Sequence, residues 1–140
     1  MRFLDANVFI YAYYRPRREL GEREQKMKEE AKAILTRIND GEEQAVTTVV
    51  HLSEVSNILK RGMSPEDLAT LILGLLMAED IAVEGVSGDL YFAAAELGRE
   101  LKMDPNDALS VEIMKRNQIS EIYSFDSDFD KVHGITRLPD

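Results

Sequence analysis

An aspartate interrupts the apolar run with which the chain begins. In the segment RFLDANVFIYA, residues 2–12, apolar side chains both precede and follow Asp5. A carboxylate in such a place is costly to bury unless it is paired or bound to a cation. The segment can therefore belong to a folded core only if something compensates Asp5. No Lys, Arg or His stands at a position that singles it out as that partner.

Strand-like and helix-like segments alternate along the whole chain. The strand patterns fall at 2–5, 45–48, 81–86, 121–125 and 135–138. The helix patterns and start signals fall at 7–14, 19–39, 49–60, 64–77, 87–101 and 104–117, with a short turn or helix at 126–132. This alternation predicts one α/β domain over residues 1–140, a three-layer α/β/α sandwich with a central, mostly parallel sheet.

Charge and residue types exclude several classes of protein. The chain has no cysteine, so disulfides and thiolate metal sites are excluded, which fits a reducing compartment. The start lacks a signal-peptide pattern, and the longest apolar run, 68–78, is too short to span a bilayer. We therefore expect a cytoplasmic protein with no membrane partner. The net charge of −9 argues by itself against nucleic-acid binding, unless several carboxylates converge on bound metal.

Four carboxylates fall where a site can form. In a parallel sheet the binding crevice lies beyond the carboxyl ends of the strands. Asp5 ends the first predicted strand and Asp126 follows the fourth. Asp107 lies in the first turn of a helix, and Glu54 lies at the edge of a core-facing helix stripe. Each of the four can also be interpreted simply as a helix cap or as a solvent-exposed residue on the side of a helix. The coincidence of two aspartates at strand ends favours a functional site.

Other motifs give little support to other chemistries. The alternating acids of 126–130 are not a calcium loop, because Lys131 stands where that loop needs glycine and Arg137 where it needs glutamate. His51 is expected to be a partly buried helix residue and His133 a surface turn residue, with no metal-site spacing between them.

The chain resembles the PIN domain in four stretches taken together. They are FLDANVFIYA, TTVVHLSEVSNIL, DPNDALSVEIMKRN and IYSFDSDFDKVHGITRL. The PIN domain is the metal-dependent nuclease fold of VapC-type toxins, and the resemblance spans nearly the whole chain. It implies a metal-dependent endoribonuclease, the toxin of a VapBC-type toxin–antitoxin pair. The metal-binding and catalytic acids that it implies are Asp5, Glu54, Asp107 and Asp126. Among these we expect Asp5 to be the central metal ligand, with Asp107 and Asp126 completing the set, and Glu54 to be an outer ligand or to orient a water.

The same resemblance suggests supporting residues and partners. Asn7, Ser124 and Asp128 are expected to support the acids. Oxygen-only ligands favour Mg²⁺ or Mn²⁺. The basic residues predicted to hold the RNA backbone are Arg15, Arg17, Arg18, Lys60 and Arg61. A small antitoxin and a homodimer are expected, with the apolar helix 64–77 and the tyrosine-rich helix after Asp5 as docking or dimer surfaces.

Two alternatives remain open on the sequence. In a small phosphatase of the haloacid dehalogenase type, Asp5 would be the nucleophile and Asp126 and Asp130 the magnesium acids. Asn7 then stands where that family usually has a second aspartate. In a catalytically inactive PIN module, the chain would serve RNA binding or assembly.

Overall fold

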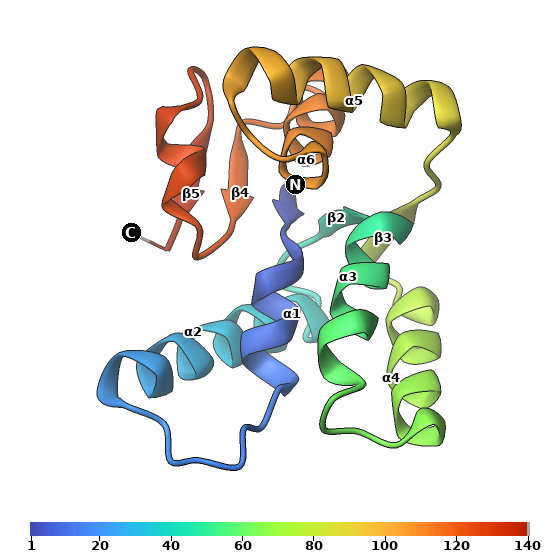
Figure 1. Ribbon diagram of the computed structural model, residues 1–140. Helices are drawn as coiled ribbons and strands as arrows, with labels where there is room; N and C mark the ends of the chain where they lie inside the picture. The colour runs from blue at the N-terminus through green and yellow to red at the C-terminus, as the bar shows by residue number, and fades with distance from the viewer. Residues whose placement is uncertain (140) are drawn as a thin grey trace.

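The computed structural model describes residues 1–139 and builds them around one five-stranded sheet (Figure 1). The strands are β1 (Arg2–Leu4), β2 (Ala45–Thr48), β3 (Ile81–Glu84), β4 (Glu121–Tyr123) and β5 (Thr136–Leu138). Their order is β3-β2-β1-β4-β5, and every neighbouring pair is parallel. The predicted α/β class is confirmed, and the sheet is parallel throughout.

Helices fill the connections that parallel strands require. They are α1 (Ala6–Tyr13), α2 (Glu22–Asn39), α3 (Val49–Leu59), α4 (Pro65–Met77), α5 (Gly88–Leu101), α6 (Pro105–Arg116) and the 3₁₀ helix η1 (Ser127–Lys131). Figure 1 shows α1 to α4 gathered on one side of the sheet and α5 and α6 on the other.

The three layers follow from the alternation of side chains along each strand. In β1, Leu4 packs into the core cluster shared with α1, α2 and α3, whereas Phe3 packs into the cluster shared with α5 and α6. Both side chains are fully buried. A strand buried on both faces reads as a continuous apolar run, which is why Asp5 marks the end of β1 so clearly.

Most helix boundaries lie within one residue of their predicted positions, because the capping residues act as expected. The side chains of Thr48, Ser64, Ser87 and Asp104 each accept a hydrogen bond from a backbone N–H in the first turn of the helix that follows. The exception is α2, which begins at Glu22 and not at Glu19. Its N-cap is Gly21, and the preceding residues belong to the loop after α1.

The apolar helix α4 is not buried in this chain. Only Leu75 of α4 is buried, while Leu73, Leu76 and Met77 are 57%, 48% and 79% exposed. These exposed apolar side chains are compatible with the expected docking or dimer surface on this helix, which stays a prediction. No helix within residues 1–139 combines the length and apolarity needed to cross a membrane.

Gly98 allows α5 to end close to α6. A Cβ atom at this position would lie 2.7 Å from the carbonyl oxygen of Met103, which is closer than such atoms approach each other. The chain turns back directly after α5, with Lys102 in the left-handed conformation at φ 57°. This tight connection sets the position of α6, and therefore of Asp107 in its first turn.

Candidate functional site

The buried carboxylate of Asp5 is compensated by hydrogen bonds from the chain itself. β1 and β4 are adjacent in the register Leu4 to Tyr123, so Asp5 and Ser124 follow paired residues. Asp5 Oδ2 accepts a hydrogen bond of 2.7 Å from Ser124 Oγ, and Oδ1 accepts one of 2.9 Å from the backbone N–H of Ala6. Asp5 is therefore both the N-cap of α1 and part of a polar group at the strand ends.

Ser124 and Asn7 connect Asp5 to the segment that carries Asp126. Ser124 Oγ accepts hydrogen bonds from Asp126 N at 3.0 Å and from Asn7 Nδ2 at 3.3 Å. Asn7 Oδ1 in turn accepts one from the backbone N–H of Phe125 at 3.3 Å. These contacts fix the chain after β4 against the start of α1. That Asn7 and Ser124 support the acids in this way stays a prediction.

Three other carboxylates converge near Asp5. One carboxylate oxygen from each of Asp107, Asp126 and Asp128 lies within 4.8 Å of the other two. Asp126 Oδ1 also accepts a hydrogen bond of 2.9 Å from Asp128 N, which holds the start of η1. The compact set contains Asp128, which was predicted only to support the acids. It does not contain Asp5, one of the three predicted metal ligands.

Burial and like charges raise the pKa values of the two central acids. Burial raises the pKa of Asp5 to about 7, and the charges of Glu54 and Asp126 add to the rise. The pKa of Asp107 rises to about 8, mainly through burial and then through the charges of Asp5 and Asp104. Without a cation these carboxyl groups hold protons near neutral pH, whereas a bound cation would favour their charged forms.

Glu54 reaches the same group from α3. Its side chain is half-buried, and burial raises its pKa, against a hydrogen bond with the side chain of Asn106. Within residues 1–139, Oε1 of Glu54 is buried and has no hydrogen-bond partner. An acceptor of this kind is costly unless a bound group satisfies it, so Glu54 is available to a ligand at this site.

The donor set fits a hard divalent cation. All the candidate ligand atoms are carboxylate oxygens, which suit Mg²⁺ and Mn²⁺. Asp107, Asp126 and Asp128 are close enough to share one ion. The like charges of neighbouring acids add to the effect of burial in raising the pKa values of Asp5 and Asp107. The four acids that the sequence singled out thus lie in one neighbourhood, although only Asp107 and Asp126 belong to the compact set.

Comparison with known proteins gives the family. The family model of the PIN domain matches residues 2–135. The chain belongs to the PIN domain family. This PIN domain is similar in structure to the Mycobacterium tuberculosis toxin VapC20, described as a sarcin-ricin loop cleaving toxin. The TM-score is 0.69 with 22% sequence identity, over 93% of both chains.

A chain of a toxin–antitoxin complex from Klebsiella pneumoniae is also similar. Its TM-score is 0.65 with 17% identity, over 97% of this chain and 96% of that one. At these identities the likeness concerns the fold. No curated protein sequence matches the chain.

The family assignment counts against the phosphatase alternative, and so does Asp130. The phosphatase hypothesis uses Asp130 as a magnesium ligand. In the structure, Asp130 forms a two-pronged ion pair with Arg137, with distances of 2.9 and 3.1 Å. That pairing lowers the pKa of Asp130, through hydrogen bonding and charge.

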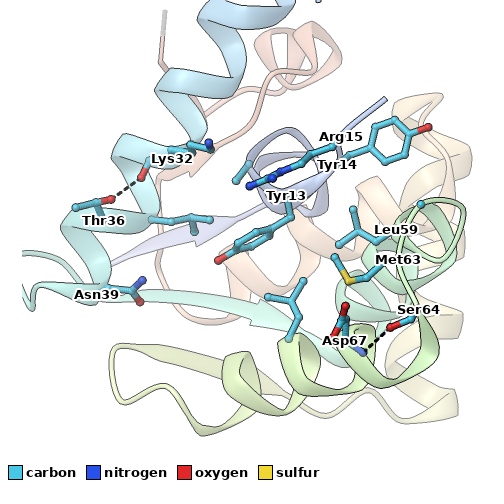
Figure 2. Close-up of a pocket in the computed structure, with 14 residues that line it drawn as sticks. Tyr13, Tyr14, Arg15, Lys32, Thr36, Asn39, Leu59, Met63, Ser64 and Asp67 are labelled. Carbon is cyan, nitrogen blue, oxygen red and sulfur yellow. Dashed lines mark hydrogen bonds between the residues drawn. The ribbon is translucent and has the colours of Figure 1, made fainter. Parts of the chain in front are cut away.

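The arginines predicted to hold RNA follow the end of α1 that is far from Asp5. The eight residues of α1 span about 12 Å, and Arg15 lies beyond its end. Arg15 lines a cavity of about 620 Å³ between α2 and α4, together with Tyr13 and Lys32 (Figure 2). Arg18 is already held by Glu24, with distances of 2.7 and 3.0 Å. The predicted RNA-binding residues therefore do not surround the acids.

His51 is more deeply buried than the sequence indicated. The side chain is 1% exposed, so the expectation of partial burial is wrong. Its Nδ1 lies 2.6 Å from Thr48 Oγ1 and its Nε2 lies 2.8 Å from Ser110 Oγ. Burial lowers the pKa of His51 to about 4, so the ring is neutral and joins α3 to α6. His133 is exposed, as expected.

Two residues near Glu54, Asn106 and Tyr91, have no role among the predictions from the sequence. Asn106 contacts Glu54, and the hydroxyl of Tyr91 donates a hydrogen bond to Asn106 Oδ1. Asn106 directly precedes the candidate metal ligand Asp107, so its position in the sequence could have indicated that it lies near the site. Tyr91 gave no such signal, because only the packing of α5 on α6 brings it to the site.

Proposed function

We propose that this PIN domain, formed by residues 1–140, is an Mg²⁺- or Mn²⁺-dependent endoribonuclease and the toxin of a VapBC-type pair. The observation that carries the proposal is the convergence of Asp107, Asp126 and Asp128 beside the buried Asp5 and the half-buried Glu54. The charges of these neighbouring acids repel one another, and a bound cation would relieve that repulsion.

The chain's own residues have distinct roles in this proposal. Asp5, Asp107 and Asp126 hold the metal, with Asp128 as a further ligand. Each carboxylate oxygen offers two lone-pair positions, so Asp5 keeps acceptor capacity beyond its two hydrogen bonds. Ser124 and Asn7 orient Asp5 and the segment before Asp126.

Glu54, the remaining acid, orients the water that attacks the phosphate. Glu54 accepts a hydrogen bond from that water at its unpartnered Oε1 and holds the water in line with the scissile phosphate. A bound divalent ion would stabilise charge on the phosphoryl oxygens and lower the pKa of bound water.

RNA would reach the acids along the side of α1. Arg15, Arg17, Lys60 and Arg61 at the far end of α1 and α3 hold phosphates several nucleotides away from the scissile bond. Arg18 joins them only after releasing Glu24. Such contacts position the RNA without reading its sequence. Binding should therefore weaken as salt is added.

Protein partners are part of the same proposal. The similar chain from Klebsiella pneumoniae belongs to a toxin–antitoxin complex, which supports a small antitoxin as a partner here. The cavity between α2 and α4, lined by Tyr13, Met63 and Leu71, is the proposed place for it (Figure 2). The exposed apolar side chains of α4 are the proposed homodimer surface. The absence of cysteine fits the proposed cytoplasmic location.

Asp5→Asn tests the catalytic proposal. Asparagine keeps the size of the side chain and the Oδ1 acceptor for the N–H of Ala6, but its Nδ2 cannot accept the hydrogen bond from Ser124 Oγ. The fold should therefore persist with some loss of stability. Mn²⁺-dependent cleavage of RNA should be lost. Unimpaired cleavage by a preparation free of contaminating nuclease would overturn the assignment.

Calorimetric titration with Mn²⁺ separates the proposal from an inactive PIN module. An active site of this kind should bind Mn²⁺, and Asp126→Asn should weaken that binding. A chain that binds no Mn²⁺ and cleaves no RNA would be a module for binding or assembly.

A further inference from the structure

A second hollow opens directly beside Glu54. It has a volume of about 340 Å³ and is lined by residues of α3, α6 and the start of α5. Glu54 and Asn106 form the wall that it shares with the acids, and Asn57 lies about one turn further along α3. Its lining includes no Lys or Arg. A phosphate would therefore meet an acid here and no countercharge, whereas a neutral polar group would meet hydrogen-bonding partners.

A hydrogen bond fixes one side of this hollow. The hydroxyl of Tyr91 donates to Asn106 Oδ1, and Asn106 lines the hollow together with Glu54. Tyr91 is therefore held in place although it is 37% exposed. A ring that is both accessible and fixed offers a stacking surface that needs no ordering when a ligand binds.

The other side of the hollow offers an unused amide. Asn57 is exposed and, within residues 1–139, makes no side-chain hydrogen bond. Two half-buried valines, Val50 and Val86, add apolar surface to the lining of the hollow. The hollow thus combines a fixed aromatic ring, apolar side chains and a free amide that can donate and accept at once.

We propose that this hollow binds the base of the nucleotide next to the scissile bond, with Tyr91 as the stacking residue and Asn57 as the residue that reads the base. The proposal rests on the proposed ribonuclease function, because it places the base beside the acids that would cut the chain. Proteins recognise single-stranded RNA by stacking bases on aromatic rings and hydrogen-bonding to their edges. An asparagine amide pairs in two-pronged fashion with adenine, so adenine is the expected base.

The first experiment detects base binding without cleavage. Neutral nucleosides (adenosine, guanosine, cytidine and uridine) are titrated into ¹⁵N-labelled protein in EDTA and followed by NMR, for which a 15.9 kDa chain is well suited. Adenosine should shift the side-chain amide signals of Asn57 and the backbone signal of Tyr91. The side-chain amide of Asn39, which is exposed at the end of α2 and does not line this hollow, is the internal control and should not move.

The second experiment measures base preference during cleavage. A pool of RNAs randomised around one site is cut in Mn²⁺ by the wild type, Asn57→Ala, Tyr91→Ala and the matched control Asn39→Ala, and the ends are sequenced. Asn57→Ala should reduce the preference at one position next to the cut by roughly 5- to 100-fold. It should leave cleavage at disfavoured bases unchanged. Asn39→Ala should keep the wild-type preference.

The outcomes separate this proposal from the proposed function. Nucleoside shifts at Asn57 together with a lost preference in Asn57→Ala support it. No shift at millimolar nucleoside, or a preference that survives both Asn57→Ala and Tyr91→Ala, overturns it. If adenosine binds at Asn57 but the wild type cuts no RNA, the ribonuclease proposal fails while the base site stands. Thermal unfolding of each variant checks that the fold is retained.

Discussion

Ser124 donates a hydrogen bond of 2.7 Å from its hydroxyl to the carboxylate of Asp5, across the ends of two neighbouring parallel strands. The two residues are 119 positions apart in the chain. The bond compensates a carboxylate that is 5% exposed, and it ties the first strand to the segment that carries Asp126. Ser124 thus stabilises the buried carboxylate of Asp5 and also holds the backbone of Asp126 beside it.

Ser124→Ala should impair the site more than the fold. The variant removes the donor to Asp5 and the acceptor for Asp126 N and Asn7 Nδ2. Loss of a residue that orients metal ligands commonly costs about 10- to 100-fold in metal affinity or activity. We expect a fall of that order in the Mn²⁺-dependent cleavage rate. Ser120→Ala, at an exposed serine before β4, is the control and should leave the rate unchanged.

Stability in EDTA should fall as pH rises from about 4 to about 8. The folded-state pKa values of Asp5 and Asp107, about 7 and about 8, lie above the ordinary value of 3.8. Between these limits Asp5 and Asp107 keep two protons in the folded chain that they release in the unfolded chain. Buried His51 opposes this below about pH 6.5, because its folded pKa is lowered to about 4, but it accounts for one proton against two, so raising the pH still favours unfolding. Asp107→Asn removes one of these groups and should flatten the dependence. Urea unfolding at several pH values measures this, and stability that rises over this range would contradict the pKa assignments.

A divalent cation should reverse that loss of stability. An ion that binds only the folded chain stabilises it by mass action, so Mn²⁺ at about 100 times its dissociation constant should raise Tm by roughly 5–10 °C at pH 8. The rise should shrink at pH 5, where the acids hold protons. Asp126→Asn should abolish the rise, whereas Asp67→Asn, at an exposed aspartate in the first turn of α4, should keep it. An equal rise in both variants would place the ion elsewhere.

Lys28→Met should destabilise α1 and thereby the whole chain. The buried ammonium of Lys28 donates hydrogen bonds to the carbonyl oxygens of Tyr11, Ala12 and Tyr14, at 3.2, 3.1 and 3.1 Å. Methionine keeps the length of the side chain but leaves these carbonyls without a donor, at a cost of about 2 kcal/mol in unfolding free energy. Lys26→Met, at a side chain that is 77% exposed, is the matched control and should change little in a urea titration.

Much of the fold follows from local sequence signals. Serine, threonine and aspartate caps mark the starts of four helices, and apolar runs mark strands that are buried on both faces. These features depend on neighbours in sequence, so they can be read without the tertiary structure. The start of α2 was missed because its N-cap is Gly21, which has no side chain to signal the cap.

Local patterns in the chain are enough to identify the two strand-end acids Asp5 and Asp126, the helix-start acid Asp107 and the need to compensate Asp5. The contacts that these acids make can be seen only in the folded chain. It supplies Ser124 and Ala6 N as the partners of Asp5, adds Asp128 to the acids, and leaves the arginines at the far end of α1. The reason is physical, because contacts between distant residues depend on strand order and helix packing. No local pattern encodes those.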